Sequence, residues 1–143
     1  MSSNILVTGA AAYVCGSNVA DFLSSNDPVL KESLNVVIHT ASSLDLNLGL
    51  NLLAGLAEQQ KRSGSQAYFI HPSGLSAFCP KTGWPEAVMQ GSGPIFDTEK
   101  QFADSFAIRN VDVTIFETAK SLGITSFIVV PSTVCIMEKK QES

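Results

Sequence analysis

The sequence predicts an α/β fold, in the form of a reduced Rossmann-like three-layer domain with a parallel sheet of about four strands. Two observations lead to this prediction. Apolar runs of strand length recur along the 143 residues, and segments with apolar residues at helical spacing lie between them. Strands that alternate with helices pair in parallel through right-handed crossovers. We expect one domain over residues 1–137, followed by a polar tail at 138–143.

The N-terminal unit has the order strand, small-residue turn and helix. The aliphatic run at 5–7 is followed by Thr-Gly-Ala-Ala-Ala at 8–12, which predicts a strand that ends in a turn. Apolar residues then recur at helical spacing, at Val14, Val19, Phe22 and Leu23. The helix should end within 24–28, because Pro28 cannot continue it and Ser, Asn and Asp favour turns.

The second unit repeats this order. Residues 36–39 form an apolar run that is typical of a strand buried on both faces of a parallel sheet. Leucines at helical spacing predict a helix from Leu46 to Arg62 that stops at Gly64. The basic residues at 61–62 suit the negative end of the helix dipole.

The third strand, at 67–70, leads into a segment rich in proline and glycine that extends to Pro94. Irregular segments of this length are usually functional, so we expect a substrate pocket here. Phe78, Trp84 and Met89 either line that pocket or cover an exposed edge of the core, and both interpretations remain open.

The C-terminal part predicts two helices and a strand. Residues 98–109 alternate charged residues with Phe102, Phe106 and Ile108, and residues 111–122 form a second amphipathic segment that Gly123 ends. The last strand covers 127–130.

Composition narrows the classes of function. The formal net charge is −4 and no basic cluster is present, which argues against a nucleic-acid or anionic-membrane surface. No apolar run approaches the ~20 residues that span a bilayer. The three cysteines are far apart and form no CxxC pair, so neither a disulfide nor a metal site is expected. A cytoplasmic location follows as an expectation.

The turn after the first strand is a candidate phosphate-binding loop. Backbone N–H groups and the start of the next helix can cradle a pyrophosphate at such a turn. Gly9 holds the first of the three expected glycine positions, while Ala12 and Cys15 hold the other two. We predict that Gly9, Ala12, Tyr13 and Val14 contact a cofactor. The alternative is a tight structural turn without a nucleotide.

Five segments resemble the motifs of extended short-chain dehydrogenases/reductases, closest to epimerase/dehydratase-like and NmrA-like reductases of fungal type. The resemblance covers nearly the whole chain, with the motifs at 5–10, 37–42, 69–73, 96–100 and 130–134. It implies a truncated NAD(P)-binding domain with NAD or NADP as cofactor. It also implies catalytic roles for Ser73 and Lys100, and cofactor contacts from His39, Ala41, Lys100 and Pro131.

Two departures from the family pattern bear on activity. Phe96 stands where the family has the tyrosine that exchanges a proton with the substrate, and losing general acid–base catalysis typically costs ~10²–10⁴-fold in rate. Only residues 27–35 stand where the family inserts two more strands, the first of which reads the adenosine ribose. Redox turnover should therefore be impaired.

Two functions remain open. The first is a NAD(P)-binding protein resembling epimerase/dehydratase-type oxidoreductases, with impaired catalysis. The second is a non-catalytic interaction protein or remnant that forms homo-oligomers through exposed sheet edges. The individual residues have plainer interpretations too: His39 is structural, Ser73 shapes a turn and Lys100 is a solvated surface lysine.

Overall fold

The computed structural model describes residues 4–9, 34–89, 91 and 94–131. Within them, four strands form one parallel sheet in the order β1-β2-β3-β4. The strands are β1 (Asn4–Thr8), β2 (Leu34–His39), β3 (Tyr68–Pro72) and β4 (Thr125–Val129). The predicted α/β fold with a parallel sheet of about four strands is confirmed.

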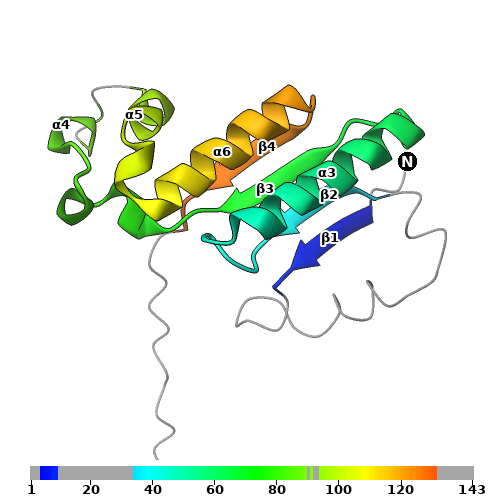
Figure 1. Ribbon diagram of the computed structural model, residues 1–143, viewed down its shortest axis with the longest axis horizontal. Coiled ribbons are helices and arrows are strands. Elements are labelled where there is room, and N and C mark those ends of the chain that lie inside the picture. The colour runs from blue at the N-terminus through cyan, green and yellow to red at the C-terminus, as the bar shows by residue number, and fades with distance from the viewer. Residues whose placement is uncertain (1–3, 10–33, 90, 92–93, 132–143) are drawn as a thin grey trace, which may run out of the picture.

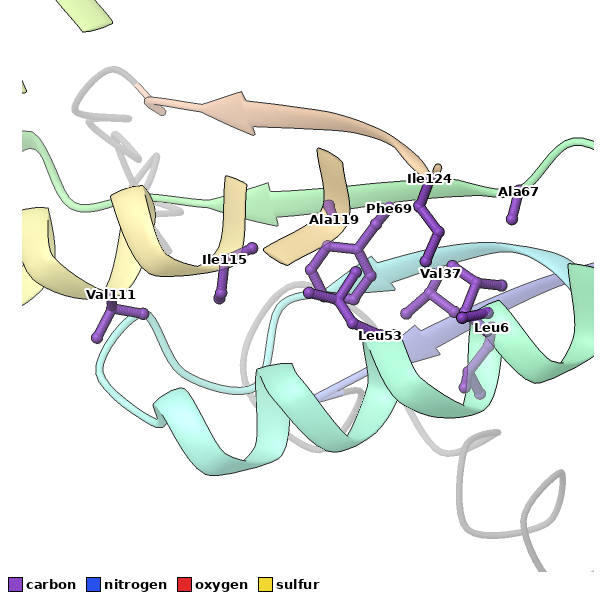
Figure 2. Close-up of a cluster of buried hydrophobic side chains, with 11 residues drawn as sticks. Leu6, Val37, Leu53, Ala67, Phe69, Val111, Ile115, Ala119 and Ile124 are labelled. Atoms are coloured by element: carbon purple, nitrogen blue, oxygen red, sulfur yellow. The ribbon is translucent and has the colours of Figure 1, made fainter. Parts of the chain in front are cut away.

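Two helices, α3 (Leu46–Ser63) and α6 (Ala107–Ser121), pack side by side on one face of this sheet, as Figure 1 shows. Leu6, Val37 and Phe69 are neighbours across three strands and point toward these helices. Leu53 and Ile115 meet them from α3 and α6, and both are fully buried (Figure 2). Truncating one such side chain to alanine typically costs about 2–5 kcal/mol, so this cluster is the main source of stability.

Helix α3 has the ends that its sequence predicts. Asp45 caps its start by accepting a hydrogen bond from the backbone N–H of Leu48 at 3.0 Å. Gly64 ends it in the left-handed conformation, at φ 67°, and donates its N–H to the carbonyl of Gln60. The predicted stop at Gly64 is confirmed.

The opposite face of the sheet carries exposed apolar side chains. Ile5, Tyr68 and Val129 are 53%, 38% and 46% exposed. Val36 and Ile38 of β2 are half-buried, whereas Val37 is buried. Within the described residues, the prediction that residues 36–39 are buried on both faces is not met, because the two long helices described, α3 and α6, both cover the face of Val37.

The segment between β3 and α6 contains more helix than its composition predicts. It forms short helical turns at η1 (Leu75–Phe78), η2 (Pro80–Thr82), α4 (Glu86–Met89), α5 (Ile95–Gln101) and η3 (Ala103–Ser105). Figure 1 shows α4 and α5 beyond the carboxyl ends of β3 and β4. The segment thus closes over the edge of the sheet where the strands end.

The boundary between the last two helices differs from the prediction. A single helix over 98–109 is wrong, because Phe106 is extended (φ −155°, ψ 125°) and separates η3 from α6. Ser105 donates its hydroxyl to the carbonyl of Phe102, which stabilises this break. Helix α6 therefore begins at Ala107, and β4 begins two residues earlier than predicted.

Some predictions lie outside the described residues. These are the first helix, within 14–23, and the polar tail at 138–143. In the part of the chain that the structure describes, no helix is long and apolar enough to cross a membrane.

Candidate functional site

Five polar side chains with almost no exposed surface meet at the carboxyl ends of β2 and β3. They are His39, His71, Ser73, Glu99 and Asp112. The two histidines come from β2 and β3, the serine follows β3, and the acids come from α5 and α6. Charged groups are rarely buried without partners, so their contacts define what this cluster can do.

Asp112 is the centre of the cluster. Its Oδ2 accepts a hydrogen bond from the hydroxyl of Ser73, and its Oδ1 lies 3.2 Å from Nε2 of His71. The His71 contact is close enough for an ion pair but is not aligned as a hydrogen bond. Ser73 is also fixed by its backbone N–H, which donates to the carbonyl of Val129 at 2.8 Å. Asp112 thus joins β3 to α6.

The two histidines of the cluster lie next to each other. Nδ1 of His39 lies 3.1 Å from Nδ1 of His71, and the rings stack with centroids 5.2 Å apart. The two Nδ1 atoms can share a hydrogen bond only when one of them donates a proton and the other accepts it. Burial and the neighbouring His71 lower the pKa of His39 to about 4. His39 is therefore neutral at physiological pH.

Glu99 is a buried carboxyl group beside a second one. Burial, charge repulsion from the nearby Asp112 carboxyl group and a hydrogen bond with it together raise the pKa of Glu99 to about 8. The Arg109 guanidinium opposes this shift. Glu99 thus holds its proton at neutral pH.

Arg109 is the positively charged residue near the cluster, and it anchors the segment between β3 and α6. Its guanidinium donates to the carbonyls of Ala77 (2.6 Å) and Thr82 (3.0 Å) and to the hydroxyl of Ser105 (2.9 Å). It also lies 5.3 Å from the ring centre of Trp84. Because Trp84 is buried against Arg109, it belongs to the interior of this segment, whereas Phe78 lines a pocket.

That pocket, of about 480 Å³, lies between α5, α6 and the edge of β4. Its wall is mostly apolar and includes one acid, Glu99, together with Phe78, Ile95, Phe96, Phe116, Ser126, Phe127, Ile128 and Val130. The Phe96 and Phe116 rings pack with centroids 4.3 Å apart. The pocket runs along the edge of β4, from Ser126 to Val130.

The two predicted catalytic residues lie apart. Ser73 is buried against Asp112, whereas the Lys100 side chain is 57% exposed and pairs with Glu117 at 2.7 Å. Helix α5 turns Glu99 inward and Lys100 outward. The structure therefore brings Ser73 together with Glu99 and Asp112, and not with Lys100.

Among the predicted cofactor contacts, Gly9 and Ala41 lie side by side. A Cβ on Gly9 would stand 2.5 Å from Cα of Ala41, and Gly9 has φ 75°. Next to it, Thr40 donates its hydroxyl to the carbonyl of Thr8. His39 points into the core and Pro131 is exposed at the end of β4. Ala12, Tyr13 and Val14 lie outside the described residues.

Sequence reasoning missed Glu99, Arg109 and Asp112, although a signal was present. Buried residues of α6 fall at 108, 111, 112, 115 and 119, which is the spacing of one helical face. Asp112 is therefore a charged residue within an apolar stripe. The predicted helix boundary at 111 hid this pattern, since the stripe becomes visible only when α6 begins at Ala107.

The titratable residues of this cluster do not form a metal site. No group of three or more His, Cys, Asp or Glu side chains within the described ranges is arranged to hold a metal ion. Comparison with protein-family models, with curated proteins and with solved structures found no match for this chain. A proposal about function therefore depends on the parallel α/β sheet and on the side chains at its edge.

Proposed function

We propose that the chain is a nicotinamide-dinucleotide-binding protein of Rossmann-like architecture without ordinary reductase chemistry. One observation carries the proposal: Gly9 ends β1 in a left-handed conformation and packs against the backbone of Ala41 at the end of β2. A positive φ and a missing Cβ are what a tight turn beneath a pyrophosphate requires. The resemblance of residues 5–10 and 37–42 to short-chain dehydrogenases supports the same ligand.

The absence of reductase chemistry is argued from three positions. Phe96 has no ionisable group and packs on Phe116. Lys100 is paired with Glu117 at the surface, and the hydroxyl of Ser73 is donated to Asp112. Proton transfer needs donor and acceptor within hydrogen-bond reach of the substrate, and these three groups do not converge.

A titration with NADH and NADPH, followed by calorimetry, tests the proposal. We expect binding, and we expect Ala41→Asp to weaken it about tenfold or more, because a carboxylate beside the turn repels phosphate. Ser121→Asp, on the exposed last turn of α6, is the matched control and should bind as the wild type does. No binding of either dinucleotide at millimolar concentration would overturn the proposal.

A second candidate function is association with another copy of the chain. The exposed apolar residues Ile5, Tyr68 and Val129 favour it, since parallel sheets are usually covered on both faces. Light scattering on a sizing column should then show a dimer that Tyr68→Lys dissociates. A stable monomer at high concentration would remove this candidate.

A further inference from the structure

The pocket beside α5 combines aromatic rings with a single buried acid. We propose that it binds a small hydrophobic amine in its ammonium form, with the Glu99 carboxylate as the counter-ion. This inference goes beyond dinucleotide binding. It concerns the β4 edge of the sheet rather than the Gly9 turn, so the two proposals fail independently.

Among the residues that line the pocket, Glu99 is the one with a buried polar atom that lacks a hydrogen-bond partner. It is 3% exposed, and its Oε1 is buried without a hydrogen-bond partner. A buried polar atom without a partner is unfavourable, so a ligand donor at this atom recovers free energy. A hydrogen-bond donor that ends in an apolar body fits both the oxygen and the wall around it.

The charges around Glu99 favour a cation over an anion. Asp112 and Arg109, both on α6, contribute one negative and one positive charge, and His71 lies on the far side of Asp112. An ammonium group that binds an ionised Glu99 adds one charge of each sign and leaves the site balanced. An anionic ligand would instead face two carboxyl groups, which disfavours it.

The aromatic wall fits the same ligand. Four of the lining residues are phenylalanines, namely Phe78, Phe96, Phe116 and Phe127. Ring faces attract ammonium groups, and more strongly where water is excluded. A volume of about 480 Å³ lies within the usual range of small-molecule sites. Phe127 and Ile95 are more than half exposed and stand at the rim.

Proton movement gives this inference a distinctive signature. No covalent bond forms, and the ligand keeps its ammonium proton. Because the pKa of Glu99 is about 8, binding below this pH must release the Glu99 proton to the buffer. The fraction of protein that is ready to bind then falls roughly tenfold for each pH unit below 8.

Calorimetry with 2-phenylethylamine as the probe tests the inference. We expect its affinity to rise roughly tenfold from pH 6 to pH 7 and to level off above pH 8, with release of close to one proton per ligand at pH 6.5. The neutral analogue 2-phenylethanol should bind more weakly and without proton release, and 3-phenylpropionate should not bind.

Variants assign the effect to Glu99. Glu99→Gln keeps a group that can hydrogen-bond Asp112, and it should abolish both amine binding and proton release. Glu117→Gln is the matched control, because this exposed carboxylate lies outside the pocket wall. Phe127→Ala, at the exposed rim, should weaken the amine several-fold while leaving its pH dependence unchanged.

Three results would overturn the inference. They are no binding of the amine at millimolar concentration, equal binding of the amine and the alcohol, and unchanged amine binding by Glu99→Gln. If Glu99→Gln does not fold, the proton release and pH dependence of the wild-type protein decide the question. NADH binding has no influence on any of these results.

Discussion

The two ends of the carboxyl edge of the sheet are held together in different ways. At β1 and β2, Gly9 packs against the backbone of Ala41, and the Thr40 hydroxyl donates a hydrogen bond to the carbonyl of Thr8. At β3 and α6 the contacts are between titratable side chains centred on Asp112. The first end depends on shape and the second on protonation. The same edge thus combines close backbone packing at one end with buried titratable side chains at the other.

The largest expected effect comes from removing the centre of the charged end. Asp112→Ala leaves the Ser73 hydroxyl and the Glu99 carboxyl group without the carboxylate that each of them hydrogen-bonds. Leaving a buried polar group without its partner typically costs about 1–3 kcal/mol for each group, and we expect the summed loss in urea unfolding. Asp104→Ala, an exposed acid just before α6, is the control and should have little effect. Equal losses of stability for the two variants would show that Asp112 does not hold the cluster together.

The next effect tests the end that depends on shape. Gly9→Ala introduces a Cβ that would stand 2.5 Å from Ala41 Cα, in addition to an unfavourable φ of 75°. Gly64→Ala has a similar φ of 67° but open space around the new Cβ. We expect Gly9→Ala to cost about 1–3 kcal/mol more than Gly64→Ala in the free energy of unfolding. A similar cost for both variants would mean that the close packing at Ala41 contributes nothing.

The fold was more predictable from the sequence than the site was. The strands and α3 are predicted by short-range sequence patterns, such as the apolar run at 36–39 and the helix stop at Gly64. The cluster depends on residues that meet only after folding, since Glu99 and Asp112 lie on different helices. The motif at 96–100 suggested a catalytic Lys100, but neighbouring residues of a helix point in different directions, and on α5 it is Glu99 that is buried and Lys100 that is exposed.

The pH dependence of stability separates the two ends further. The raised pKa of Glu99 makes the folded state bind more protons than the unfolded state between pH 4.5 and 8, so stability falls as pH rises through this range. The lowered pKa of His39 acts in the opposite direction between pH 4 and 6.5. The two contributions oppose each other below pH 6.5.

Of these two contributions, only that of Glu99 remains above pH 6.5. Unfolding at several pH values should show stability decreasing between pH 6.5 and 8 by at most about 2 kcal/mol, at no more than about 1.4 kcal/mol per pH unit. Glu99→Gln should flatten this region, whereas Gly64→Ala should leave its slope unchanged. A wild-type stability that rises over this range would contradict the assignment.

The smallest effect is expected on the exposed face of the sheet, which belongs to neither end. In a monomer, Tyr68→Lys should change the free energy of unfolding by no more than about 0.5 kcal/mol, because the side chain is already exposed. A much larger loss that depends on protein concentration would show that a second copy covers this face.

The central claim is that Glu99 stays protonated at neutral pH because it is buried beside Asp112. Carbon-13 NMR of the glutamate side-chain carboxyl groups, assigned by comparison with Glu99→Gln, measures this directly. The account predicts a midpoint for Glu99 near pH 8, well above the ordinary glutamate value of 4.5. A midpoint below pH 5 would contradict this prediction.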